Sequence, residues 1–126
     1  MTKLVPQDWH EVRLSGKLPE RRSNHCSFIV NDFLYIHGGR DIKEGPNNTM
    51  WKLKVNGVKE LIDDPDYGVT WEPVTQKGNA IPSKISHHKP AIFGHSVVIF
   101  GGKNDFENNP DAYEFDTNKS SWSKMK

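Results

Sequence analysis

The sequence has one cysteine and few apolar residues. Because Cys26 stands alone, no disulfide can form within the chain, and this favours a reducing compartment. Hydrophobic residues make up 34% of the 126 residues and the mean hydropathy is −0.75, so much of the chain must form surface or loops. No apolar run approaches the length of a membrane span, and the N-terminal residues lack the apolar core of a signal peptide. We therefore expect one modest cytoplasmic domain.

The chain also has no excess of charge of either sign. Seventeen Lys and Arg residues stand against sixteen Asp and Glu residues, which gives a formal net charge of +1. The cations are scattered, and the densest cluster is only Arg21-Arg22. Such a balance produces no field that would hold nucleic acid or an anionic membrane, so we expect neither as a partner.

Signatures of common catalytic and metal sites are missing. The sequence contains no G-x-S-x-G, no G-x-x-x-x-G-K-[ST] and no H-E-x-x-H. Six histidines are present, but His87 and His88 are adjacent and would point to opposite sides of a strand. No Cys or carboxylate stands beside them at the spacing of metal ligands. We therefore expect no catalytic residue, no metal site and no cofactor.

A repeated order of residues is the strongest feature that the sequence does contain. In both copies a Gly stands seven positions after a Trp, a His stands six positions after a Pro, and the second Gly of a pair stands fourteen positions after that His. An ordered set found twice at matched spacing indicates an internal structural repeat. The first copy is Trp9, Gly16, Pro19, His25, Gly38 and Gly39, and the second is Trp71, Gly78, Pro82, His88, Gly101 and Gly102.

Each copy predicts short β-strands. HCSFIV and FLYIHGG are rich in aromatic and β-branched residues, and Asn31-Asp32 separates them, which is typical of a hairpin. TMWKLKV (49–55) alternates as a third strand, and TWEPVT (70–75) favours a fourth. No segment keeps an apolar period of 3.6 residues long enough for a helix. Four short strands per unit, at a period of about 50 residues, predict the blades of a β-propeller.

The repeated residues resemble the kelch repeat, which combines P-x-x-R-x-x-H, a hydrophobic hairpin, Gly-Gly, an aromatic residue in the third strand and Trp in the fourth. The resemblance covers residues 9–122 and implies an all-β fold of antiparallel four-stranded blades, a partial β-propeller. In the second copy Ile85 stands where the first copy has Arg22. The residues assigned to the structural motif are Gly38, Gly39, Gly101, Gly102, Trp51, Trp71, Tyr113 and Trp122.

The resemblance divides the chain into three parts. Residues 1–21 hold an extra fourth-strand segment and an interblade loop, residues 22–75 form the first blade with a loop insertion at 56–68, and residues 76–126 form an interblade loop and the second blade. Two blades cannot close a ring that usually has about 4–8 of them. The chain is therefore part of a longer propeller, assembles with other chains, or is capped in another way. The extra N-terminal strand favours a longer propeller, because it would complete the last blade and clasp the ring shut.

The resemblance also implies a binding face. In kelch proteins the loops between second and third strands and the loops between blades lie on one side, so a protein-interaction module of the adaptor or scaffold type is expected. Cations mixed with Asp and Asn in these loops suit an acidic or phosphorylated peptide. Further kelch blades are the other expected partner. The candidate partner-binding residues are Arg22, Arg40, Asp41, Lys43, Lys84, Lys103, Asn104 and Asp105.

One alternative remains open at this stage. Some kelch propellers are oxidases, lyases or epimerases, so the chain is alternatively a partial or divergent enzyme of that kind. A bound metal or cofactor would favour the enzyme, and a neighbouring BTB or F-box domain would favour the adaptor. For the adaptor we expect that Arg22→Ala and Arg40→Ala weaken partner capture and leave thermal unfolding nearly unchanged.

Overall fold

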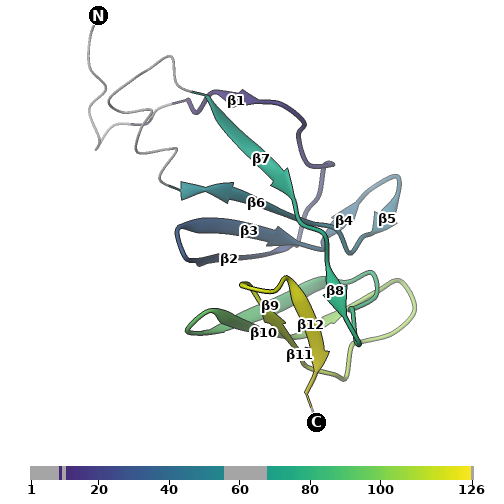
Figure 1. Ribbon diagram of the computed structural model, residues 1–126. Helices are drawn as coiled ribbons and strands as arrows, with labels where there is room; N and C mark the ends of the chain where they lie inside the picture. Colours follow the sequence, from purple (N-terminus) through teal and green to yellow (C-terminus); the bar gives the residue numbers. More distant parts are fainter. Residues whose placement is uncertain (1–8, 10, 56–67, 126) are drawn as a thin grey trace, which may run out of the picture.

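The structure is a computed structural model that describes residues 9, 11–55 and 68–125. The described part is built from β-strands joined by loops (Figure 1). No helix within it is long and apolar enough to cross a membrane. The strands are β1 (Leu14–Ser15), β2 (Cys26–Val30), β3 (Phe33–His37), β4 (Arg40–Asp41), β5 (Gly45–Pro46), β6 (Met50–Lys54), β7 (Val69–Pro73), β8 (Lys77–Gly78), β9 (Ser86–Phe93), β10 (Ser96–Lys103), β11 (Tyr113–Asp116) and β12 (Ser121–Lys124).

Two five-stranded sheets form the two blades. Their strand orders are β1-β7-β6-β3-β2 and β8-β12-β11-β10-β9. In each sheet the four longer strands run antiparallel in the order that the repeat predicts. β4 and β5 form a separate two-stranded ribbon within the loop between β3 and β6. The expected all-β fold of antiparallel four-stranded units is confirmed.

A short parallel strand at the outer edge of each blade was not expected from the sequence. β1 pairs parallel with β7, and β8 pairs parallel with β12, so the chain runs along the outer edge of each blade before it enters that blade. Gly78 permits this approach, because a Cβ atom there would lie 2.1 Å from the carbonyl oxygen of Trp122. The expected pairing of the N-terminal segment with a preceding blade stays a prediction. The insertion expected at 56–68 lies, apart from Gly68, outside the described residues.

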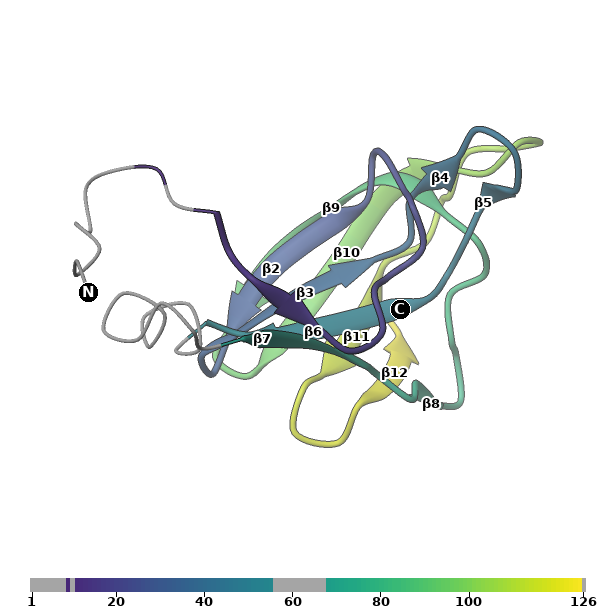
Figure 2. The same cartoon turned by 90° about the horizontal axis from the view of Figure 1, so that it is seen from above.

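The two sheets pack face to face, as Figure 2 shows from above, and the core lies between them. Aromatic rings join the sheets: Tyr35 meets Phe115 edge-on at 6.3 Å between ring centroids, and the ring of His37 lies 5.2 Å from that of Trp122. Such aromatic pairs add about 0.5–1.5 kcal/mol to the free energy gained from burial alone. The core consists of Cys26, Phe28, Val30, Tyr35, Met50, Val97, Ile99, Phe115 and Trp122.

Candidate functional site

At the glycine pairs, the backbone of each blade lies close to the segment that joins the two blades. The backbone N–H of Gly39 donates a 2.8 Å hydrogen bond to the carbonyl of Ile85 in the interblade segment. A Cβ atom on Gly38 would lie 2.6 Å from the same carbonyl oxygen, and one on Gly102 would lie 2.6 Å from the carbonyl oxygen of Ser86. Close backbone approach therefore requires glycine at Gly38 and Gly102.

Two asparagines close the loops that follow the glycine pairs. Asn47 donates its backbone N–H to the carbonyl of Gly39 at 2.9 Å, and Asn109 does the same to Gly102 at 2.8 Å. Each side-chain oxygen also accepts the backbone N–H two residues later at 3.2 Å. Neither asparagine is among the residues predicted from the sequence, although both stand four positions before the aromatic residue of the third strand.

The loops 40–48 and 103–111 lie at the same end of the two blades (Figure 1). An ion pair joins them, because Arg40 Nη1 donates to Asp105 Oδ1 across the gap between the blades. Both side chains remain partly exposed. The structure thus brings together the candidates Arg40 and Asp105 with Lys84, Lys103 and Asn104. Asp41 and Lys43 lie in the neighbouring β4–β5 ribbon. This end of the molecule is called the loop face below.

Arg22 has a different environment from the other candidates. Its side chain is only 3% exposed, and its guanidinium donates to the carbonyls of Gly38 at 2.9 Å and Thr49 at 3.2 Å. It also donates to the hydroxyl of Thr49 and to the carboxylate of Glu20, each at 2.7 Å. Burial lowers the pKa of Arg22 from its usual value of 12.5, and Glu20 opposes this shift. Because the guanidinium is used internally, we revise the stability expectation: Arg22→Ala should destabilise the fold.

The second blade has no arginine at this position, and an asparagine binds the corresponding backbone carbonyls. Ile85 occupies the position of Arg22 in the repeat and is buried. The carbonyls of Gly101 and Asp111 accept hydrogen bonds from the side-chain amide of Asn109, at 2.9 and 2.8 Å. These carbonyls correspond to those that Arg22 bridges in the first blade, so Asn109 compensates for the departure from the kelch pattern.

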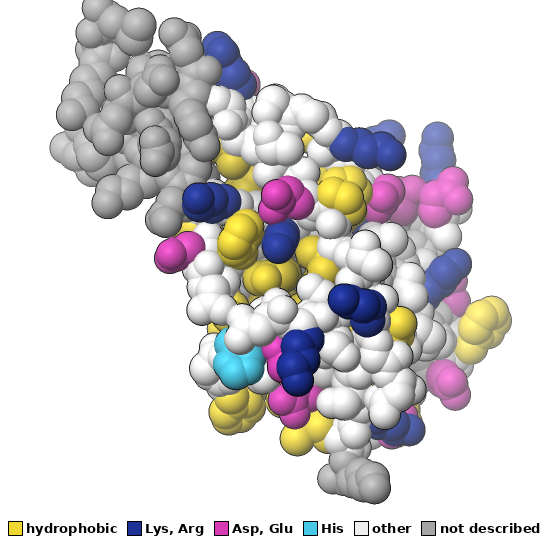
Figure 3. Space-filling view, viewed as in Figure 1, with side chains coloured by type: hydrophobic (Ala, Val, Ile, Leu, Met, Phe, Trp, Pro, Cys, Tyr) yellow, Lys and Arg dark blue, Asp and Glu magenta, His cyan; other side chains and the backbone are white. Residues whose placement is uncertain are grey.

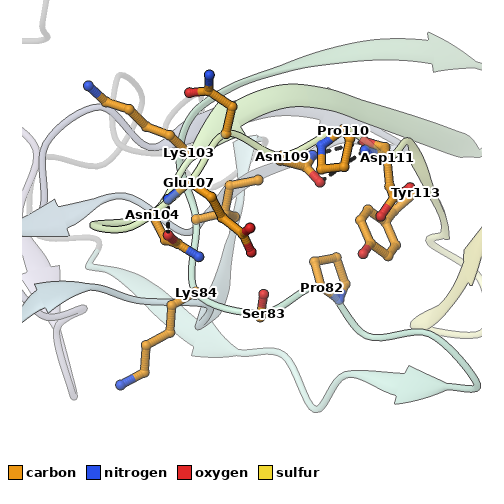
Figure 4. A pocket seen from close by; sticks show the side chains of 12 residues that line it. Pro82, Ser83, Lys84, Lys103, Asn104, Glu107, Asn109, Pro110, Asp111 and Tyr113 are labelled. Atoms are coloured by element: carbon orange, nitrogen blue, oxygen red, sulfur yellow. Dashed lines mark hydrogen bonds between the residues drawn. The ribbon is translucent and has the colours of Figure 1, made fainter.

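A pocket lies on the loop face between the interblade segment and the loop 103–111 (Figure 4). The carboxylate of Glu107 and the hydroxyls of Ser83 and Tyr113 point toward its centre. Lys84 and Lys103 line its rim, and their ammonium groups point away from the centre. A second hollow adjoins this pocket and shares Ser83 and Lys84 with it. The loop face is therefore hollowed as well as polar.

Charges of both signs are mixed over the face of the molecule that is seen in Figure 3. Figure 3 shows Lys and Arg side chains interspersed with Asp and Glu, and no broad area of one sign. Two large apolar side chains, Ile42 and Phe106, are almost fully exposed in the loops of the loop face. Such a surface gives little long-range steering, so recognition here depends on local contacts.

Three titratable side chains, His37, His88 and Cys26, are buried within the described part of the molecule. His37 Nδ1 lies 3.0 Å from His88 Nε2, and both rings are buried. Burial, the largest cause, lowers the pKa of His37 to about 3 and that of His88 to about 4. Burial likewise raises the pKa of Cys26 to about 12, so its thiol stays protonated. Among the described residues, no group of three or more His, Cys, Asp or Glu is placed to hold a metal ion.

Comparison with known proteins gives relatives of several kinds. Leucine-zipper-like transcriptional regulator 1 of Mus musculus is 25% identical over 123 residues, which are 98% of this chain and 14% of that protein. Kelch domain-containing protein 3 of Rattus norvegicus is 27% identical over 124 residues, which cover 90% of this chain and 29% of that protein. N-(sulfonatooxy)prop-2-enimidothioate sulfolyase of Thlaspi arvense is 25% identical over 124 residues, with 97% of this chain and 32% of that protein covered.

The chain spans between 14% and 32% of the length of these relatives. A family model described as the KLHDC2/KLHL20/DRC7 Kelch-repeats domain matches residues 1–126. Together with the two antiparallel blades and their paired glycines, this match shows the family. The chain belongs to the kelch-repeat family.

Proposed function

We propose that this chain is an adaptor or scaffold module that binds a protein partner through the loop face. Membership of the kelch family supports a protein-interaction role in general. The observation that carries the proposal is the Arg40–Asp105 ion pair, since it joins the second-to-third-strand loops of two blades into one surface. Loops held on a rigid sheet scaffold are a common place for recognition.

We also propose that the two blades function within a larger propeller. Phe93 and Phe100 on the outer face of the second blade are 65% and 47% exposed. They stand 63 residues after Val30 and His37 (93 − 30 and 100 − 37), which are buried between the blades. The second blade thus leaves exposed the positions at which the first blade packs against its neighbour, and a following blade would cover them.

Glycine environments give an independent argument for a following blade. Gly38 is tightly enclosed, because a Cβ atom there would meet both Ile85 and His88 of the second blade. Its counterpart Gly101 also has a positive φ, of 71°, but no atom lies within 4 Å of where its Cβ would be. The open space at Gly101 is where a third blade would enter.

The partner that we propose is an acidic or phosphorylated peptide segment. Lys84 and Lys103 border the pocket on the loop face, and within the described residues neither side chain forms an ion pair. Arg40, by contrast, is already paired with Asp105. Lys84 and Lys103 are therefore cations at the rim of this pocket that are available to a carboxylate or phosphate.

A peptide selection tests this proposal. A library with fixed glutamate or phosphoserine positions would be selected on the immobilised full chain, and the affinity of selected peptides measured by fluorescence anisotropy. We expect the double variant Lys84→Ala/Lys103→Ala to bind about tenfold more weakly, since exposed charge pairs contribute little more than about 1 kcal/mol together. Lys119→Ala is the matched control, because Lys119 is exposed in the turn at the opposite end of the second blade. Equal binding by the double variant would contradict the proposal.

A kelch-propeller enzyme is the alternative function, because one relative is named as a sulfolyase. The buried histidine pair and the protonated Cys26 give it no support within the described residues. Metal analysis and absorption spectroscopy of the purified chain would test this alternative. A stoichiometric metal or chromophore would favour it over the interaction module. A cytoplasmic location stays a prediction from the sequence.

A further inference from the structure

The two blades differ at one position of the repeat that bears on binding. In the first blade, a guanidinium occupies a site made by Glu20, Gly38 and Thr49. Ser83 and Ile85 stand 63 residues after Glu20 and Arg22 (83 − 20 and 85 − 22). The second blade therefore lacks both the arginine and its carboxylate partner at this point of the repeat.

A pocket occupies the corresponding place in the second blade. Ser83 and Ile85 form part of its wall, together with Asp111 and Tyr113 on the opposite side. Asp111 follows Asn109 by two residues, as Thr49 follows Asn47 in the first blade. The second blade therefore has a carboxylate at the position where the first blade has the hydroxyl that binds its arginine. The hollow exists beside a position at which a long arginine has been replaced by a shorter isoleucine.

The chemistry inside the pocket suits a cationic donor group. The Glu107 carboxylate and the hydroxyls of Ser83 and Tyr113 converge on its centre (Figure 4). Among the described residues Glu107 forms no ion pair, and Asp111 is paired only with Lys124, at 3.2 Å. Because the ammonium groups at the rim point outward, no cationic side chain among those that line the pocket fills its centre.

The size of the pocket indicates what kind of ligand it accepts. Its volume is about 160 Å³, which is smaller than the roughly 300–1,000 Å³ of a site for a drug-sized molecule. One side chain of a bound segment is therefore a better occupant than a free cofactor. A planar guanidinium offers five N–H donors, so it can satisfy a carboxylate and two hydroxyls together, which a compact ammonium does less well.

We infer that this pocket receives an arginine side chain of the partner. The first blade supplies the template, since Arg22 makes the same kind of contacts with Glu20 and Thr49. The inference rests on the proposed function, and it narrows the partner to a segment in which an arginine is flanked by acidic or phosphorylated residues. The arginine enters the pocket, and the flanking anions meet Lys84 and Lys103 at the rim.

A titration with N-acetyl-arginine amide, followed by ¹⁵N NMR on the full chain, tests the pocket directly. We expect chemical shift changes centred on Ser83, Glu107 and Tyr113, and an affinity about tenfold lower in Glu107→Gln. The neutral citrulline analogue should cause no such changes. Glu72→Gln is the matched control, because Glu72 is an exposed carboxylate on the outermost long strand of the first blade.

A gain of affinity provides a second readout that does not depend on loss of function. Ser83→Glu restores the carboxylate that the first blade has at Glu20, so it should tighten binding of N-acetyl-arginine amide several-fold. An unchanged spectrum outside the pocket establishes that both variants keep the fold. Absence of shifts at the pocket, or equal shifts with citrulline, would overturn the inference.

The inference and the proposed function can fail separately. If acidic peptides bind through Lys84 and Lys103 but Glu107→Gln has no effect on any arginine-containing ligand, the pocket inference is wrong and the proposed function stands. If N-acetyl-arginine amide binds the pocket but no peptide depends on the two lysines, the acidic partner is wrong and the pocket stands.

Discussion

His37 and His88 lie in contact across the interface between the two blades, with 3.0 Å between Nδ1 of His37 and Nε2 of His88. Their rings are nearly perpendicular, at 87°, and both side chains are buried. One nitrogen of this contact must donate a proton and the other must accept it, so the pair requires at least one neutral ring. His37 Nε2 and His88 Nδ1 have no hydrogen-bond partner in the part of the chain that the structure describes. This contact makes the packing of the blades sensitive to protonation.

The first prediction follows from the depressed pKa values of this pair, about 3 for His37 and about 4 for His88. An unfolded histidine titrates near 6.5, so the unfolded chain binds more protons than the folded chain between these values. The contribution of the neutral histidine pair to the free energy of unfolding is therefore fully present above pH 6.5, and it is lost as the pH falls toward 4. Each histidine contributes up to about 1.4 kcal/mol per pH unit within this window. Urea unfolding at pH 7.5, 6.5, 5.5 and 5.0 measures the slope.

His37→Phe serves as the control for the pH prediction. Phe100 occupies the corresponding position in the second blade, so phenylalanine is compatible with the repeat. The groups that act on the pair from neighbouring positions are Arg22, His25, His87 and Lys89, and none of them is acidic. The variant should lower the pH slope by about half. A slope equal to that of the unaltered chain would show that the pair does not control acid stability.

The second prediction concerns Arg22. Arg22→Ala should lower the free energy of unfolding by about 2–4 kcal/mol, because it leaves the carbonyls of Gly38 and Thr49 without their charged donor. Arg22→Ile should cost less, since Asn47 can then take the role that Asn109 has beside Ile85. Arg21→Ala, at the exposed neighbouring position, should change stability by less than about 0.5 kcal/mol. Chemical denaturation measures all three variants. If Arg22→Ala left the free energy of unfolding unchanged, Arg22 would again be a candidate for partner binding.

The third prediction uses two equivalent glycines. Both have a positive φ, 68° for Gly38 and 71° for Gly101, so alanine at either costs about 1–2 kcal/mol of backbone strain. Gly38→Ala should cost a further 1–3 kcal/mol or so, because its Cβ would lie 2.7 Å from Cε1 of His88. Thermal unfolding measures the stability of both variants. Equal losses of stability in Gly38→Ala and Gly101→Ala would mean that the interface does not enclose Gly38. In a longer chain with a third blade, Gly101→Ala should become as costly as Gly38→Ala.

The fourth prediction separates binding from stability at Arg40. The Arg40–Asp105 ion pair is partly exposed, so a double-mutant cycle of Arg40→Ala and Asp105→Ala should give a coupling of about 0.2–1 kcal/mol in unfolding. Arg40→Ala should nevertheless weaken capture of a selected peptide, because the two loops lose their link. A coupling above about 2 kcal/mol would make the ion pair part of the fold rather than of the binding surface.

The sequence was most informative where local pattern decides structure. The hairpin around Asn31-Asp32 and the glycine pairs could be predicted, because strand propensity and turn chemistry act over a few residues. The parallel strands β1 and β8 could not, since each has two residues and depends on a partner far along the chain. A strand of that length has no hydrophobic period to detect.

The candidate site, like the fold, could be predicted only in part. The repeat located the loop face, but it did not reveal that Arg22 is buried, because a motif position says nothing of solvent exposure. The replacement of that arginine by Asn109 was equally hidden, since Ile85 and Asn109 lie 24 residues apart (109 − 85). The contact between His37 and His88 required the packing of two sheets. Long-range contacts, not residue types, separate what could be predicted from what could not.

Hydrogen exchange of the full chain, with and without a selected acidic or phosphorylated peptide, tests the loop face most directly. The peptide should protect backbone amides in 40–48, 79–85 and 103–111 and leave the rest of both blades unchanged. Protection confined instead to the outer edge strands β1 and β8, with the three loops unchanged, would contradict a loop-face interaction module.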